Sequence, residues 1–291
     1  MNISPPAPMF FIDTADINYI DTLLAKMPKE VLQSCAGVTT NPSALHKMDI
    51  NTKQKLKDHL CSLANVLDKK LTNLTNHTYE IHVQLPNSNA TIQELFTWDT
   101  FLTDIEVNLP AGANLVMKVP PRLDLLTYVD KDPTALTLNV TGLTSADVCL
   151  KCMEYSSVDY VSIIPGRMLE AGIDPTPHLE RLRLATRDRA APAKVITGSM
   201  RTIEGLRTCI EYGTVPTIGS RVWDLFTPID FESFIKWWNV QPPQLATKSL
   251  IYSKNELVLS SWPAEAKLSL EFFETMDRLG TDLYGELRET P

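Results

Sequence analysis

The chain has 291 residues, 44% of them hydrophobic and 21% charged, a composition typical of a globular protein with a sizeable core. Its 27 Lys and Arg against 35 Asp and Glu give a net charge of −8, which argues against nucleic acid or an anionic membrane as a partner because both need a basic footprint. No apolar run approaches the roughly 20 residues of a membrane span, and the first ten residues lack a signal-peptide pattern, so we expect a cytoplasmic location.

Eight short β-branched or apolar runs recur along the chain, and amphipathic stretches of roughly 10–20 residues separate most of them. One such stretch, residues 91–107, carries Ile92, Leu95, Phe96, Leu102 and Ile105 on one side, as an amphipathic helix does. The eight runs predict strands at residues 9–14, 37–41, 79–85, 115–120, 135–141, 160–165, 194–199 and 215–219.

Regular alternation of strands and helices favours parallel pairing through right-handed crossovers. Eight such units predict an α/β fold, a single (β/α)8 TIM barrel over residues 1–230, with a doubly wound open sheet as the alternative. None of the 11 glycines belongs to a G-x-G-x-x-G or G-x-x-x-x-G-K-[ST] motif, which disfavours the nucleotide-binding versions of the open sheet.

Residues 231–291 predict a C-terminal helical extension. A short helix is expected at 231–239, and an irregular insertion or hairpin at 240–260. Ser261 as a cap and Pro263 as a first helical residue then predict an amphipathic helix over 262–288. We expect this helix to pack either on its own barrel or on a neighbouring subunit of a homo-oligomer. Its apolar stripe consists of Leu268, Phe272, Met276, Leu279 and Leu283.

The five cysteines are an odd number, and most lie in stretches that read as core helix, which disfavours a disulfide framework. Cys149 and Cys152 form a C-x-x-C pair. A zinc site needs a second such pair or two histidines at ligand spacing, and the sequence supplies neither. We therefore predict two thiols that face the core, and no metal.

The alternation of side chains along the predicted strands separates two faces. In an α/β barrel, one parity faces the helices and the other faces the barrel axis. The helix-facing parity is apolar, with Ile12, Ile81, Val83, Leu115, Met117, Val119, Leu138, Val140, Val161, Ile163 and Val195. The opposite parity is polar near the strand ends, where barrel enzymes build their active sites, with Asp13, Asn41, His82, Gln84, Lys118, Asn139, Thr141, Ser162 and Ser199.

Lys118 is the most informative of these residues, because it lies in an apolar strand where an unpaired ammonium is costly. It either pairs with Asp13 as a structural ion pair, or it is a desolvated amine of lowered pKa that can act as a Schiff-base nucleophile. Arg167 and Arg201 follow neighbouring predicted strands, where loops can bind a phosphate, and cations there would help to lower that pKa. Surface ion pairs are the alternative for both arginines.

Six segments of the sequence resemble motifs of the transaldolase family, which includes the fructose-6-phosphate aldolases. They are FIDTAD (11–16), GVTTNPS (37–43), VMKVP (116–120), LNVT (138–141), SIIPGR (162–167) and GSMR (198–201). The resemblance spans residues 9–219 and implies a class I aldolase mechanism on a ketose phosphate, without a cofactor or a metal.

The resemblance also implies roles for individual residues. Lys118 would form the imine, and Asp13 would accept and return the proton of the cleaved hydroxyl. Gln84 and Thr141 would hold the water of imine formation. The remaining site residues would bind substrate hydroxyls or the terminal phosphate, and these are Asn41, Asn139, Ser162, Arg167, Ser199 and Arg201.

Two positions depart from the transaldolase pattern. Gln84 stands where many transaldolases carry Glu, as in the aldolase branch, and an amide cannot take a proton from water. Ile164 stands where transaldolases carry Phe and the aldolases Tyr, which favours transfer over release. The two positions thus favour opposite activities, and transaldolase is the leading hypothesis from the resemblance as a whole. Fructose-6-phosphate aldolase and a non-catalytic barrel that binds sugar phosphates are the alternatives.

Overall fold

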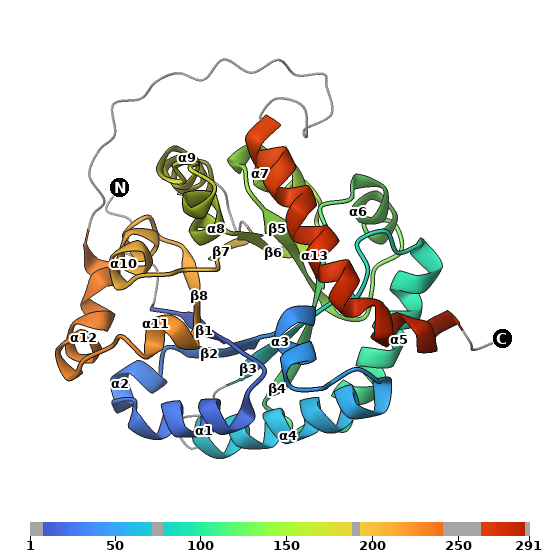
Figure 1. Cartoon of the computed structure of the whole chain (residues 1–291), viewed down its shortest axis with the longest axis horizontal. Helices are drawn as coiled ribbons and strands as arrows, with labels where there is room; N and C mark the ends of the chain where they lie inside the picture. Colours follow the sequence, from blue (N-terminus) through green and yellow to red (C-terminus); the bar gives the residue numbers. More distant parts are fainter. Residues whose placement is uncertain (1–7, 72–77, 188–192, 241–262, 289–291) are drawn as a thin grey trace.

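Eight parallel strands close into a barrel in the computed structural model, which describes residues 8–71, 78–187, 193–240 and 263–288 (Figure 1). Each strand pairs with the next one in the chain, and β1 pairs with β8 to complete the ring. The predicted TIM barrel is confirmed and the open-sheet alternative is wrong. The strands are β1 (Phe10–Asp13), β2 (Cys35–Thr39), β3 (Tyr79–Gln84), β4 (Ala113–Val119), β5 (Thr137–Leu143), β6 (Val158–Ile163), β7 (Lys194–Thr197) and β8 (Val215–Gly219).

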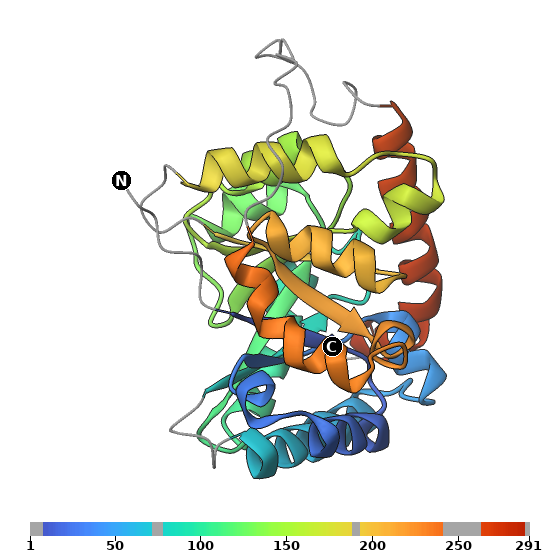
Figure 2. The same ribbon diagram turned by 90° about the vertical axis from the view of Figure 1, so that its left-hand side faces the viewer.

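Most helices lie around the outside of the barrel, and the last one crosses one of its ends (Figures 1 and 2). They are α1 (Ile17–Lys26), α2 (Lys29–Leu32), α3 (Pro42–Lys47), α4 (Lys53–Leu71), α5 (Ile92–Glu106), α6 (Leu123–Val129), α7 (Ala146–Cys152), α8 (Pro165–Glu170), α9 (Thr176–Arg187), α10 (Ile203–Glu211), α11 (Ser220–Trp223), α12 (Pro228–Phe234) and α13 (Pro263–Arg288), with a 3₁₀ helix, η2 (Ile235–Asn239), after α12.

N-terminal capping residues determine where two of the predicted helices begin. The helix predicted at 91–107 is α5, which begins after Thr91 because the Thr91 hydroxyl and the Glu94 carboxylate form a capping box. The helix predicted at 231–239 begins three residues earlier, as α12, and ends as η2. Thr227 caps α12 in the same way, and Pro228 occupies the first helical position, where its missing N–H costs nothing.

Two separate apolar clusters lie on the two sides of the strands. The larger one fills the space between strands and helices and contains every helix-facing residue predicted from strand parity. The smaller one lies inside the barrel and is made of Phe11, Ala36, Val116, Tyr160 and Ile196. Period-2 alternation therefore assigned the two faces correctly, because a strand pointing side chains to one face must point the next ones to the other.

The cysteines behave as the sequence predicts. All five are free thiols, and both Cys149 and Cys152 are buried in α7. Burial raises the pKa of the Cys152 thiol to about 12, which keeps it protonated and unreactive at neutral pH.

Helix α13 lies across the face of the barrel toward which the strands run, as the arrow of β8 shows in Figure 2. It contacts α3, β5 and α8 of its own chain. Ser269 donates to the carbonyl of Gly142, and the Ser88 hydroxyl donates to Asp277, so polar contacts also hold the helix in place. Residues 241–262, which hold most of the predicted insertion and Ser261, lie outside the described residues. No helix in the described ranges is long and apolar enough to cross a membrane.

Candidate active site

The strand register brings three of the predicted site residues side by side. Lys118 on β4 is paired with Gln84 on β3 and with Asn139 on β5. Gln84 is the last residue of β3, and Asp13 is the last residue of β1. These side chains therefore gather at the C-terminal ends of the strands, the end of the barrel that α13 covers (Figure 1).

Lys118 is a buried amine with a lowered pKa. Among the described residues, its side chain makes one hydrogen bond, from Nζ to the carbonyl oxygen of Thr40 over 2.9 Å. Burial lowers the pKa of Lys118 from 10.5 to about 8, against the opposing effect of the Asp13 carboxylate. No ion pair joins Lys118 to Asp13, although both lie in the described part of the chain. A substantial fraction of Lys118 is therefore neutral, and nucleophilic, slightly above neutral pH.

Asp13 is a partly buried carboxyl group with a raised pKa. Burial raises the pKa of Asp13 above its ordinary value and outweighs the lowering effects of Lys118, the Thr39 hydroxyl, Arg201 and Arg167. The two arginines thus act on Asp13, whereas the sequence suggested that they would act on Lys118. A carboxyl group with a raised pKa is a stronger base than an ordinary carboxylate, which suits it to accept and return a proton.

Two threonines that help to orient Asp13, Thr39 and Thr217, were not predicted from the sequence. Thr39 Oγ1 donates to Asp13 over 3.2 Å and lies 2.6 Å from Thr217 Oγ1, so β1, β2 and β8 meet through these side chains. Thr39 shares strand parity with Asn41, and that parity was the signal that could have identified it. Thr217 carries the same signal in the predicted strand 215–219, but its relation to Asp13 through Thr39 depends on closure of the barrel.

Gln84 and Thr141 are both buried. Gln84 Oε1 lies in the interior without a hydrogen-bond partner among the described residues. A buried acceptor left unpaired costs free energy, so this oxygen is suited to receive a hydrogen bond from water or from a bound hydroxyl.

Asn139 and Ser162 bind each other, while Asn41 has a local partner. Ser162 Oγ donates to Asn139 Oδ1 over 2.7 Å. Asn41 is the N-cap of α3, where its side-chain oxygen accepts from the backbone N–H of Ala44 over 2.9 Å. The capping bond leaves the amide nitrogen of Asn41 as the group that can donate to a substrate hydroxyl.

A close backbone approach brings the two arginine-bearing segments together. Arg167 lies in the first turn of α8, and Arg201 lies in the loop after β7. A Cβ atom at Gly166 would lie 1.6 Å from the carbonyl oxygen of Ser199, so only glycine fits where α8 meets this loop. Ser199 itself adopts a left-handed conformation with φ of 60°, an uncommon state for a residue with a side chain.

The two arginines differ in their partners. Arg201 forms an ion pair with Glu170, with Nε 2.6 Å from Oε1, and it also donates to the carbonyl of Ser199. For Arg201 the ion-pair alternative is therefore seen in the structure. Arg167 Nε is buried and has no hydrogen-bond partner among the described residues. An unpaired buried guanidinium N–H favours an anion as its missing partner.

Helix α13 adds an aromatic side chain that strand patterns could not reveal. The Phe272 ring lies 5.1 Å from the guanidinium carbon of Arg167, within cation–π range. Phe272 also packs with Phe273, Met276 and Ile164, the residue that follows β6. Among the described residues, no group of three or more His, Cys, Asp or Glu side chains is placed to hold a metal ion.

Comparison with known proteins adds only distant likenesses. No protein-family model matches the chain. No curated protein matches it either. Its structure is similar to malate synthase from Haloferax volcanii, with a TM-score of 0.47 and 12% identity over 99% of this chain and 96% of that chain. GGGPS from Thermoplasma volcanium is also similar, with a TM-score of 0.41 and 11% identity over 79% of this chain and 90% of that chain.

FabK from Thermotoga maritima is a further similar structure, with a TM-score of 0.41 and 11% identity over 74% of this chain. This chain spans 58% of the length of that one. The identities are too low to carry function from these proteins. The structure by itself establishes that the chain is a (β/α)8 barrel with a C-terminal helix across the C-terminal ends of its strands.

Proposed function

We propose that this chain is a transaldolase, which transfers a dihydroxyacetone unit between ketose and aldose phosphates through a Schiff base on Lys118. The observation that carries the proposal is Lys118 itself, a buried amine of lowered pKa at the C-terminal end of a barrel. A buried lysine costs stability unless it is paired, and this one has a single carbonyl partner in place of a carboxylate. The resemblance to transaldolase motifs supports the same Schiff-base chemistry and indicates a sugar phosphate as the substrate.

The reaction begins when neutral Nζ of Lys118 attacks the ketone carbon, and water leaves as the iminium forms. Gln84, with its unpaired oxygen, holds that water together with Thr141. Asp13 then takes the proton of the hydroxyl on the carbon beyond the bond that breaks. The electron pair of that C–C bond moves into the iminium and leaves an enamine, while an aldose phosphate departs. The enamine adds to an acceptor aldehyde by the reverse steps, and Asp13 returns the proton.

Fructose-6-phosphate aldolase is the alternative within the same chemistry. Gln84 favours it because the aldolase branch carries Gln at the position where many transaldolases carry Glu. Ile164 favours transfer, since it offers no hydroxyl group and packs on Phe272 and Met276 of α13.

A coupled assay with fructose 6-phosphate, with and without erythrose 4-phosphate, tests the proposal. Glyceraldehyde 3-phosphate that forms only with the acceptor indicates transaldolase, and formation without it indicates the aldolase. Binding of the sugar phosphate without turnover under either condition would identify a non-catalytic barrel and overturn the proposed reaction.

We expect Arg167→Ala to raise KM for phosphorylated ketoses more than Arg201→Ala does. Arg167 carries an unpaired buried N–H, whereas Arg201 is already engaged by Glu170. Loss of a charge-assisted hydrogen bond costs roughly 1.5–3 kcal/mol, or about 10- to 150-fold in KM. Steady-state kinetics with fructose 6-phosphate and with fructose measure the effect.

Two further variants control this comparison. Arg207→Ala removes an exposed arginine that is paired with Glu211 on α10, and it should leave both substrates unaffected. Glu170→Gln releases Arg201 and should lower KM for the phosphorylated ketose. Equal losses on fructose and fructose 6-phosphate in Arg167→Ala would mean that Arg167 is structural and that the phosphate binds elsewhere.

A further inference from the structure

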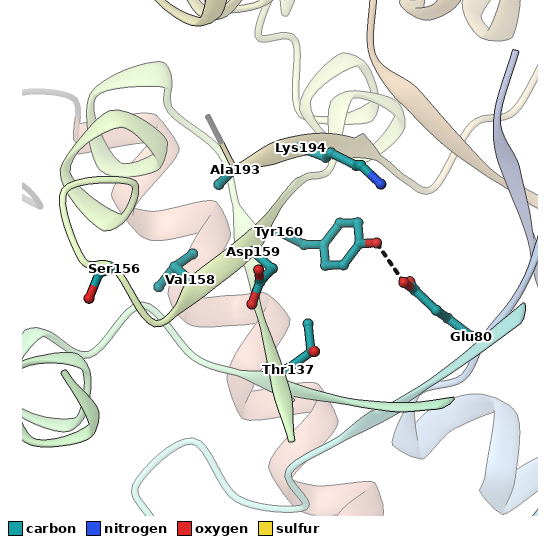
Figure 3. A pocket seen from close by; sticks show the side chains of 8 residues that line it. All are labelled: Glu80, Thr137, Ser156, Val158, Asp159, Tyr160, Ala193 and Lys194. Atoms are coloured by element: carbon teal, nitrogen blue, oxygen red, sulfur yellow. Dashed lines mark hydrogen bonds between the residues drawn. The ribbon is translucent and has the colours of Figure 1, made fainter. Parts of the chain in front are cut away.

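A chain of hydrogen bonds runs through the barrel interior, away from the candidate site. The Nδ2 group of Asn139 lies 2.9 Å from Nδ1 of His82. On the other side of the ring, His82 Nε2 lies 3.0 Å from Oε2 of Glu80. The second oxygen of Glu80 accepts from the hydroxyl of Tyr160 over 2.8 Å (Figure 3). His82 and Asn139 are completely buried, so water cannot take the place of the bond between them.

The donors and acceptors in this chain determine the tautomer of His82. An ionised Glu80 carboxylate only accepts hydrogen bonds, so Nε2 of His82 must carry a hydrogen. Burial lowers the pKa of His82, as do the nearby charges of Lys118 and Lys194, and together they outweigh the opposing effect of Glu80. The ring is therefore neutral at neutral pH, and its Nδ1 is an acceptor.

That acceptor in turn selects one of two orientations of the Asn139 amide. Ser162 cannot make the selection, because a hydroxyl group donates to an amide oxygen or accepts from an amide nitrogen equally well. Nδ1 of His82 accepts only, so it requires the nitrogen of Asn139 to face it. Edge contacts with the rings of Phe11, at 4.5 Å between centroids, and of Tyr160, at 5.1 Å, keep the imidazole plane in place.

The far end of this hydrogen-bond chain lies at a cavity. The cavity has a volume of about 340 Å³ and lies at the opposite end of the barrel, among the first residues of β5, β6 and β7. Glu80 lines it together with Lys194 and Asp159, and Figure 3 shows the Tyr160 hydroxyl directed at the Glu80 carboxylate. Burial raises the pKa of Glu80, but the hydrogen bonds from His82 and Tyr160 and the nearby charge of Lys194 outweigh it and lower that pKa. These partners keep the charge that fixes the His82 tautomer.

We infer that His82 is a positioning residue, whose unprotonated Nδ1 fixes the orientation of the Asn139 amide beside Lys118. The second hydrogen of Asn139 Nδ2 and the second lone pair of Oδ1 are then directed to hydroxyl groups of a sugar bound as an imine. The inference rests on the proposed function, because it gives Asn139 its contact with substrate. It assigns a role to His82 and Glu80, which touch neither the substrate nor Lys118.

Two near-isosteric substitutions separate the two sides of the His82 ring. His82→Asn can place its amide oxygen where Nδ1 was and keep the bond from Asn139. His82→Gln reaches the position of Nε2 and keeps the bond to Glu80, but it loses the acceptor that faces Asn139. We expect His82→Asn to retain kcat/KM within a few-fold of wild type. His82→Gln should lose about 10²-fold, because a misplaced substrate contact is costly even when the chemistry is intact.

A double-mutant cycle with Asn139→Ala shows whether His82 acts through Asn139. In the Asn139→Ala background, His82→Gln should cost less than about twofold, since the group that it orients is already gone. Equal losses in both backgrounds, or a loss in His82→Asn as large as in His82→Gln, would overturn the inference. Thermal unfolding of each variant shows that the fold is kept.

Nitrogen NMR of the protein with labelled histidine and asparagine decides the same point without turnover. We expect a protonated Nε2 and an unprotonated Nδ1 for His82, and Asn139 amide resonances that shift in His82→Gln but not in His82→Asn. A protonated Nδ1 would overturn the inference. A wild-type protein that neither turns over nor traps sugar phosphates would instead overturn the proposed function, and these resonances would still decide the role of His82.

Discussion

Lys118→Met is expected to abolish both turnover and covalent trapping of sugar phosphates. With wild-type protein, borohydride and fructose 6-phosphate should leave a reduced imine on Lys118 alone, which peptide mass mapping locates. Methionine keeps most of the side-chain volume and removes the amine, so the variant should fold and form no adduct. Lys57→Met, on the exposed side of α4, is the matched control and should trap as wild type does.

The pH dependence of trapping follows from the lowered pKa of Lys118. Only the neutral amine attacks a carbonyl, and burial places the pKa of Lys118 at about 8. The initial rate of imine formation should therefore rise with pH through about 8 and level off above it. A lysine with its ordinary pKa of about 10.4 would still gain rate well above pH 9. Such a profile, or an adduct on another lysine, would refute the assignment of the nucleophile.

The same shift predicts that Lys118→Met is more stable than wild type at neutral pH. A pKa that is lower in the folded than in the unfolded state destabilises the fold wherever the lysine is charged, and this cost disappears as pH rises from about 8 to 10.5. The lowered pKa of Lys118 corresponds to roughly 3 kcal/mol, which is the upper value for the increase in the free energy of unfolding when the charge is removed. Urea unfolding at pH 7 measures it. A stable but inactive variant would exclude misfolding as the cause of lost trapping.

Asp13→Asn is expected to slow turnover by roughly 10²–10⁴-fold while the imine still forms, because this is the usual contribution of a well-placed acid–base group. The amide keeps the shape of the carboxyl group and can still bind Thr39, so the local structure should persist. Asp21→Asn, on the exposed side of α1, is the matched control and should leave turnover unchanged. Single-turnover kinetics distinguish slow C–C cleavage from slow imine formation.

Asp13→Asn should also move the pH profile of trapping. The Asp13 carboxylate raises the pKa of Lys118, in opposition to burial, so its removal leaves burial unopposed. Trapping by the variant should therefore reach its plateau at a lower pH than trapping by wild type. An unchanged profile would mean that the two groups do not interact, and undiminished turnover would mean that another residue moves the proton.

The sequence by itself determined the barrel fold and singled out Lys118 as the main candidate for the site. Strand parity is a local property, since adjacent side chains must point to opposite faces, and it separated the apolar set from Asp13, Gln84, Lys118 and Asn139. The ends of the strands were predicted within two residues. Lys118 could be recognised because an ammonium group within an apolar run is costly wherever the run folds.

Only the tertiary structure decided which side chains meet. The register that places Lys118 between Gln84 and Asn139 depends on the stagger of strands across the barrel, which no local pattern encodes. The ion pair of Arg201 with Glu170 and the contact of Phe272 with Arg167 join the loop after β7 and helices α8 and α13, which are distant in sequence. The role of His82 depends on hydrogen-bond partners from two other strands, β5 and β6, and complementarity between such residues exists only once the strands have assembled.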